Sequence, residues 1–258
     1  MIFFLPFFLS WALSNCSFAQ TIEGDVAVYK YWHLSPGVNT TNILSSKKLP
    51  QYQNQKQVYR QIDKLLKKRK FNLIVSEGCE GEIDENFSGT FNGWSYADLK
   101  RRLRNSNYED ILTLVPLKLE VKYQKQVKTV CGDSLKLIKE CSDLFNELEI
   151  TLRQITSAHN AAKKAQFEEK RKKGLSLIDQ IKKKISERNH VFLNTILAHL
   201  PDNPVVILGG GHLEGVTDLL YAQKKIAFKV VETPGYPQED EHHLERLRQE
   251  IKDLSIKN

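Results

Sequence analysis

Cysteine is scarce in this 258-residue sequence: there are four, and no two are spaced as a Cys-x-x-Cys pair. A zinc-finger interpretation therefore has no support. Beyond residue 20, no apolar run approaches the length of a membrane-spanning helix. The chain also lacks internal repeats, low-complexity linkers and nucleic-acid-binding motifs. We therefore expect a single folded domain over residues 20–258, and we expect no nucleic-acid partner.

Charge is missing from the start of the chain, where the first charged side chain is Glu23. An apolar run followed by small and polar residues is typical of a secretory signal, here residues 1–19, with Ser17 and Ala19 before the cut. This predicts an extracytoplasmic protein, either periplasmic or secreted. Two alternatives stay open: acylation of Cys16 in an imperfect lipoprotein pattern, or retention of the segment as a membrane anchor. Either would associate the N-terminus with a membrane.

Three cysteines remain beyond this segment, at positions 79, 131 and 141. In an oxidising compartment an odd number permits one disulfide and leaves one thiol. We expect buried cysteines, with Cys131–Cys141 as the candidate bridge.

Positive charge is in excess, with a net charge of +7. Residues 163–188 contribute ten Lys or Arg against four Asp or Glu. Such a run is most often a solvated helix face, and contact with anionic lipid or nucleic acid is the alternative. Because no nucleic-acid-binding motif accompanies the run, we favour the solvated face.

Hydrophobic patterning predicts an α/β fold. Residues 26–32 and 71–76 have the composition of strands, and residues 53–70 between them show a helical apolar stripe. Residues 134–199 are helical almost throughout, with a break expected at Gly174. Strand, helix, strand and helix then follow over 205–252. We expect one mixed or mostly parallel sheet with strands from both ends of the chain, flanked by helices, with a long helical insertion at about 134–199.

Polar residues follow three of the predicted strands: His33, Glu77 and His212. In open α/β sheets, ligands bind beyond the carboxyl ends of the strands. Two imidazoles and one carboxylate converging there would suit a divalent metal such as manganese, iron, cobalt or zinc. Each residue taken alone is more often structural, as a turn histidine or a capping carboxylate.

Three glycines, Gly209, Gly210 and Gly211, stand directly before His212. Glycine permits close approach of the backbone to a ligand and tolerates positive φ, so these positions are candidates for cofactor binding. Neither the Gly-x-Gly-x-x-Gly dinucleotide pattern nor a P-loop is present, which argues against a nucleotide ligand.

The segment 187–230, "ERNHVFLNTILAHLPDNPVVILGGGHLEGVTDLLYAQKKIAFKV", resembles the C-terminal block of the TraB/GumN/Tiki family. The family pattern has an Arg-Asn or Arg-Asp pair opening a helix, here Arg188-Asn189, and a Gly-x-x-His motif, here 209–212. The N-terminal block is similar as well: a strand ending in His33, a helix containing Gln57 and Tyr59, and a strand ending in Glu77. One position departs from the pattern, since Lys30 replaces the glycine of the first Gly-x-x-His motif.

The resemblance implies a divalent metal held by His33, Glu77 and His212, with Arg188 and Asn189 nearby. It implies hydrolysis of a peptide or a small-molecule ester, with Glu77 as ligand or general base and Arg188 or Asn189 donating to the oxyanion. Strand alternation puts Lys30 on the face opposite residue 33, away from such a site. Two alternatives stay open: a non-catalytic haem- or metal-binding protein like the related ChaN group, or a degenerate member that acts by binding a partner.

Overall fold

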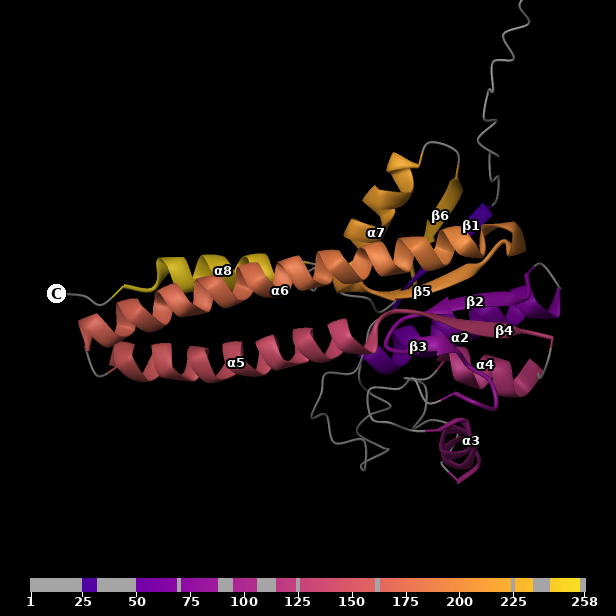
Figure 1. Ribbon diagram of the computed structural model, residues 1–258, viewed down its shortest axis with the longest axis horizontal. Helices are drawn as coiled ribbons and strands as arrows, with labels where there is room; N and C mark the ends of the chain where they lie inside the picture. The colour runs from indigo at the N-terminus through magenta and orange to yellow at the C-terminus, as the bar shows by residue number, and fades with distance from the viewer. Residues whose placement is uncertain are drawn as a thin grey trace, which may run out of the picture.

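The computed structural model describes residues 25–31, 50–68, 71–87, 95–105, 115–123, 126–160, 163–223, 226–233 and 242–255 (Figure 1). The predicted signal segment 1–19, the acylation candidate Cys16 and the predicted ligand His33 lie outside these ranges.

One sheet with the strand order β3-β4-β2-β5-β1-β6 organises the described residues. Its strands are β1 Asp25–Tyr31, β2 Leu73–Ser76, β3 Glu80–Glu82, β4 Lys128–Gly132, β5 Val205–Gly209 and β6 Ala227–Val231. Every pairing is parallel except that of β3 with β4. Because β5 lies between β1 and β2, the sheet draws on both ends of the chain.

Helices flank this sheet and extend beyond it (Figure 1). They are α2 Pro50–Lys67, α3 Tyr96–Asn105, α4 Val115–Tyr123, α5 Leu135–Asn160, α6 Lys164–Ala198, α7 Gly210–Ala222 and α8 His243–Asp253, with a short 3-10 turn at Leu200–Asp202. The predicted α/β architecture with a long helical insertion is confirmed. Helix α4 and the edge strand β3 were not predicted from the sequence.

Two apolar cores cover the two faces of the sheet. One face packs against α6 and α7 through residues such as Val206, Phe192 and Val216. The other packs against α2 and α4 through Ile207 and Ile62, among others. Strands β2 and β5 are buried along their whole length, which explains why their sequences are continuous apolar runs.

A helical arm projects from the sheet and consists of α5, the first part of α6 and α8 (Figure 1). A third apolar core fills it, including Ile155, Phe167 and Ile251. The break expected at Gly174 is wrong, because α6 runs through this residue without interruption. Gly174 is buried, and a Cβ there would lie 3.2 Å from Cδ1 of Ile155. This glycine therefore serves the close packing of α5 on α6.

None of the described helices is both long and apolar enough to cross a membrane.

Candidate functional site

The carboxyl ends of β2, β4 and β5 meet at one edge of the sheet, because these strands are neighbours and parallel. Glu77 follows β2, Asp133 follows β4, and the first turn of α7 follows β5. Helix α6 brings Arg188 and Asn189 to the same place. Residues from distant parts of the sequence thus form one polar cluster.

Glu77 is the centre of this cluster, and its side chain is only 11% exposed. Its Oε2 accepts a hydrogen bond from the backbone N–H of Gly209 at 2.5 Å. Its Oε1 lies 3.4 Å from Nη2 of Arg188 and 3.5 Å from Nε2 of His212. The carboxylate therefore contacts a backbone donor, a guanidinium and an imidazole.

His212 is buried in the first turn of α7, with 4% of its surface exposed. Its Nδ1 lies 2.6 Å from Oδ1 of Asn189. Since an amide oxygen only accepts, Nδ1 carries a proton, and in the neutral ring the lone pair on Nε2 then faces Glu77. Gly215 makes room for this arrangement, because a Cβ there would lie 2.1 Å from Nδ2 of Asn189.

Arg188 is anchored mainly by Asp133, a residue whose side chain is fully buried. The guanidinium donates from Nε to Oδ1 at 3.0 Å and from Nη2 to Oδ2 at 2.6 Å. Although burial opposes the charge, these bonds and Glu77 raise the pKa of Arg188 above its ordinary value. Arg188 is therefore a fixed cation between two carboxylates.

The Arg188-Asn189 pair does not open a helix, as the family pattern led us to expect. It lies deep within α6, which begins at Lys164. The pair lies between the part of α6 that packs in the core of the arm and the part that packs on the sheet. Packing on both sides therefore fixes the position of the pair along the helix.

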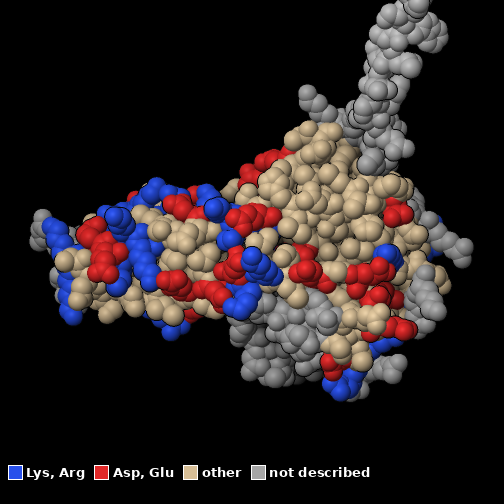
Figure 2. Space-filling model, in the orientation of Figure 1, with Lys and Arg blue, Asp and Glu red and all other residues tan. Residues whose placement is uncertain are grey.

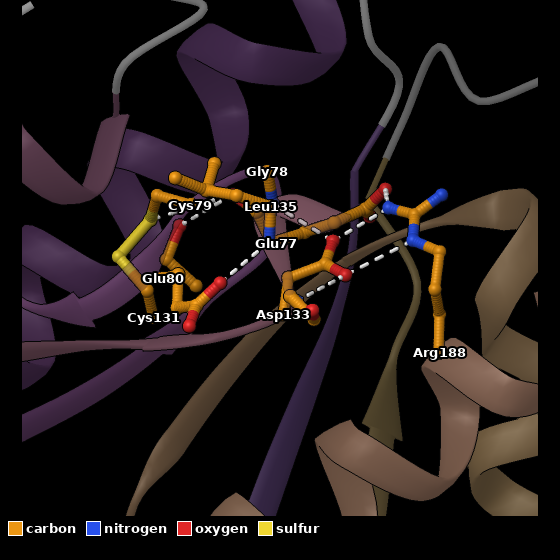
Figure 3. The surroundings of a disulfide bond; sticks show 10 residues. Glu77, Gly78, Cys79, Glu80, Cys131, Asp133, Leu135 and Arg188 are labelled. Atoms are coloured by element: carbon orange, nitrogen blue, oxygen red, sulfur yellow. Dashed lines mark hydrogen bonds and ion pairs between the residues drawn. A yellow bond between two sulfur atoms is a disulfide. The ribbon is translucent and has the colours of Figure 1, made fainter. Parts of the chain in front are cut away.

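A disulfide between Cys79 and Cys131 joins the turn after β2, which carries Glu77, to strand β4, the strand that precedes Asp133 (Figure 3). The predicted Cys131–Cys141 bridge is therefore wrong, although one disulfide and one thiol were expected. Cys79 lies next to Cys131 because the chain turns back after β2 and pairs Gly81 with Cys131.

The remaining thiol, Cys141, belongs to α5 and is buried in the core of the arm. Burial raises its pKa, and the neighbouring Arg188 partly offsets this effect. We assign it no role in the site.

The turn after β2 also connects Glu77 with the rest of the cluster through its backbone. Gly78 has a φ of 84°, in the left-handed region that favours glycine, and its N–H donates to Oδ2 of Asp133 at 3.3 Å. This turn therefore links the segment that carries Glu77 directly to the partner of Arg188.

The three glycines before His212 behave differently, since none of them has positive φ. Gly209 ends β5 and donates to Glu77, and Gly210 is buried at the start of α7. Gly211 is exposed, and a Cβ added to it would meet no atom within 4 Å. Of the three predicted binding glycines, Gly209 is thus the one whose hydrogen bond to a site residue is described, through its N–H and Oε2 of Glu77.

Lys30, which replaces a glycine of the family pattern, is buried on β1 with 5% exposure. Its side chain is on the same face of β1 as Val26 and Val28, the face that packs against α6 and α7. Because residue 33 lies outside the described ranges, the opposition of the two side chains stays a prediction.

Glu77 and His212 are the two predicted metal ligands that the structure describes, and it brings them together. Within the described ranges, no group of three or more His, Cys, Asp or Glu side chains is arranged to hold a metal ion. The described part of the site thus offers two ligands, and the third predicted ligand, His33, falls outside it.

Asp133 is the residue of this cluster that sequence reasoning missed. The signal was present, because the segment "VKTVCGD" has the composition of a strand and ends in Asp133, which directly follows β4 as Glu77 follows β2. A histidine at the end of a strand suggests a metal ligand, whereas a lone aspartate there is common in turns and does not by itself predict a site.

Comparison of the chain with models of protein families, with curated proteins and with solved structures gave no match. The resemblance to the TraB/GumN/Tiki family therefore still rests on the residues quoted above.

Proposed function

We propose that the chain is an exported metal-dependent hydrolase of the TraB/GumN/Tiki type that acts on a peptide or ester bond. The observation that carries the proposal is the approach of Nε2 of His212 to Oε1 of Glu77, at 3.5 Å. These residues belong to different ends of the sequence and follow neighbouring strands. Ligands bind at this location in open α/β sheets.

The chemistry of the pair fits a divalent cation. Two ligands that each lie about 2.1 Å from one tetrahedral ion are about 3.4 Å apart, close to the separation of Oε1 and Nε2. The hydrogen bond to Asn189 fixes the tautomer of His212 that presents Nε2 as an acceptor, as partners of metal-bound histidines do. Glu77 and His212 would hold the ion, with His33 as the proposed third ligand.

A bound divalent ion supplies a Lewis acid and lowers the pKa of a water molecule in its coordination sphere. Arg188 would stabilise negative charge that develops on a substrate carbonyl oxygen. A guanidinium has five N–H donors. The bonds to Asp133 and Glu77 use Nε and Nη2, and the thiol of Cys141 also contacts the guanidinium, so the remaining donors would serve this task. Asp133 would hold the guanidinium in place.

The disulfide is consistent with the proposed export, since such bonds persist in oxidising compartments. The compartment, the substrate class and the metal belong to the same proposal and share its test.

A second candidate function is a metal-free binding protein, and a specific observation favours it. Glu77 already contacts the cation of Arg188 and the N–H of Gly209, so its charge is partly compensated without a metal. In this case the cluster stabilises the sheet edge, and binding occurs elsewhere. A different alternative, haem binding, would use His212 to hold the iron.

Metal analysis of the purified full chain, followed by hydrolysis of a peptide library and an ester panel with added manganese, cobalt or zinc, tests the proposal. We expect metal-dependent turnover that falls at least about a hundredfold in Glu77→Gln and His212→Ala. Asn189→Ala should weaken metal binding about 10- to 100-fold, because it frees the tautomer of His212.

His190→Ala is the matched control, because His190 is exposed on α6 beside Asn189 and should change neither property. A folded protein that neither binds metal nor hydrolyses any substrate would overturn the proposal and favour the binding protein. A Soret band after haem addition that is lost in His212→Ala would favour the haem-binding alternative.

A further inference from the structure

A cavity lies along the edge of the sheet that β3 forms. It has a volume of about 450 Å³, within the range of small-molecule sites. Its walls come from β3 and the residues after it, from α3, from α4 and from the start of β4. Tyr96 and Ile83 of its wall also belong to the apolar cluster around Cys79 and Cys131.

The feature that singles out this cavity is the carboxylate of Glu120 on α4. Glu120 lines the cavity and is 8% exposed, and its Oε2 is buried without a hydrogen-bond partner in the described part of the chain. The hydroxyl of Thr129 on β4 lies close enough to lower the pKa of Glu120, but within the described ranges neither its oxygen nor Oε2 makes a hydrogen bond of ordinary geometry. Leaving a buried acceptor unsatisfied costs about 1–3 kcal/mol, and more for a charged group. Such groups are rare in native proteins, and each calls for an explanation, of which a partner that binds there is one.

Negative charge dominates the wall of the cavity. Three further carboxylates, Glu82, Asp84 and Glu85, line it together with Glu120. Two cations also line it: Lys128 is 2.7 Å from Glu82, and Nζ of Lys100 is 4.6 Å from the centre of the Tyr96 ring. Among the described residues no ion pair involves Glu120, Asp84 or Glu85. The wall thus carries more negative charge than its own lysines balance.

The spacing of these carboxylates distinguishes between two kinds of cation. A metal ion needs its ligands within about 2.0–2.6 Å, and no described group of three acidic or histidine side chains meets that requirement. A guanidinium or an alkylammonium is larger and carries several N–H donors. It can reach separated carboxylates while its alkyl chain contacts Val127 and the face of Tyr96.

We propose that this cavity binds an organic cation, a guanidinium or ammonium group on an alkyl chain, with Glu120 as its principal acceptor. Two sources present such a cation: an arginine or lysine side chain of a polypeptide, and a free amine. The proposal does not rest on the proposed hydrolase activity, since the cavity and the Glu77 cluster share no residue.

The ionisation of Glu120 agrees with this assignment. Its pKa is raised to about 7, mainly by burial and also by Glu82 and Asp84, while the nearby hydroxyls of Thr129 and Tyr96 oppose the rise. A bound cation favours the ionised carboxylate, so binding should strengthen as the pH rises through 7. The other charged groups that face the cavity are Glu85, Lys100 and Lys128.

Titration calorimetry with a matched ligand pair tests the proposal: N-acetyl-arginine amide and N-acetyl-citrulline amide, which differ in charge but hardly in shape. We expect the arginine compound to bind with a Kd below about 1 mM and the citrulline compound at least about tenfold more weakly. Glu120→Gln should weaken binding of the arginine compound at least about tenfold and remove its strengthening between pH 6 and pH 8.

Glu250→Gln is the control, because Glu250 is exposed on α8 and far from the cavity wall in sequence and fold. Agmatine and an arginine-containing hexapeptide identify the source: tighter binding of the peptide indicates a polypeptide ligand, and tighter binding of agmatine indicates a free amine. Equal binding of the arginine and citrulline compounds, no binding of either, or full binding by Glu120→Gln would each overturn the proposal.

Discussion

The edge of the sheet and the helical arm both contain many opposite charges, but they use them in different ways. At the sheet edge, Asp133 and Arg188 have side-chain exposures of 0% and 11%. On the arm, Lys139 and Asp143 pair at 2.8 Å with exposures of 71% and 61%. Figure 2 shows the surface of the arm covered by interspersed positive and negative side chains.

Burial determines what such pairs contribute. Exposed pairs are screened by water and typically contribute less than about 1 kcal/mol each. A buried pair gains little net stability from its formation, but loss of one partner leaves an uncompensated charge in the interior. The sheet edge should therefore be sensitive to single substitutions that the arm tolerates, and the following predictions test this difference.

Asp133→Ala should have the largest effect. It removes two hydrogen bonds from the buried guanidinium of Arg188 and leaves the 3.4 Å contact with Glu77 as its remaining ion pair among the described residues. We expect the free energy of unfolding to fall by about 3–5 kcal/mol, measured by urea denaturation. Asp179→Ala is the control on the arm, where Asp179 pairs with Arg248 at the surface. Equal losses in the two variants would contradict the comparison.

Removal of the disulfide comes next. The bridge closes a loop of 52 residues, for which the chain-entropy relation gives about 4 kcal/mol. We expect the double variant Cys79→Ala/Cys131→Ala to lose stability on that scale, and reducing agent should have no further effect on it. Cys141→Ala, which keeps the bridge, should lose no more than about 1 kcal/mol. A small effect of the double variant would show that packing alone holds the turn after β2 against β4.

The third prediction concerns Glu120, a buried acid without a cation. Because its folded pKa is raised from 4.5 to about 7, the folded state holds the proton more tightly, and stability falls as the pH rises from about 4.5 through 7. The full shift corresponds to about 3 kcal/mol. We expect Glu120→Gln to be the more stable protein at pH 8 and to match the unsubstituted protein near pH 4.5. Parallel unfolding free energies across this range would contradict the prediction.

Substitution of two glycines in α7 should have smaller effects of opposite sign. Gly215→Ala places a Cβ against Asn189 and should cost about 1–3 kcal/mol, with loss of the hydrogen bond to His212. Gly211→Ala meets no atom within 4 Å and should be neutral or stabilising by up to about 1 kcal/mol. Urea denaturation measures both, and nitrogen chemical shifts of the His212 ring report its tautomer. A harmless Gly215→Ala would show that Asn189 has room to move.

Lys139→Ala should have the smallest effect of all. Its pair with Asp143 is exposed and spans one helical turn, so we expect no loss of stability that urea denaturation resolves. Added salt should leave the two proteins equally stable as well. A clear loss in urea denaturation would mean that exposed charges support the arm more than the comparison allows.

Hydrophobic pattern was enough to predict the strands and helices that have one uniformly apolar face. Strands β2 and β5 are apolar along their whole length and were identified from their composition. Helix α4 was missed because two of its buried residues, Lys118 and Glu120, are charged, which obscures the apolar stripe. Strand β3 was missed because its three residues are exposed, and it forms only where β4 offers an edge to pair with.

The site was only partly accessible to the same reasoning. Glu77 and His212 stand at strand ends, a position that sequence reveals once the strands are known. The partner of each cysteine and the role of Asp133 depend on which strands are neighbours, and strand order is a property of the whole fold. The interior position of Arg188 in α6 depends on the unbroken path of that helix through Gly174.

Among the described strands, β1 pairs with β5 and β6, which begin about 180 and 200 residues later in the chain. During synthesis, therefore, the backbone groups of β1 find these partners only after β5 and β6 have been made. Contacts between such distant segments slow folding, because a long loop must close before they form. The nascent polypeptide should remain open to proteases and chaperones until β6 has been translated.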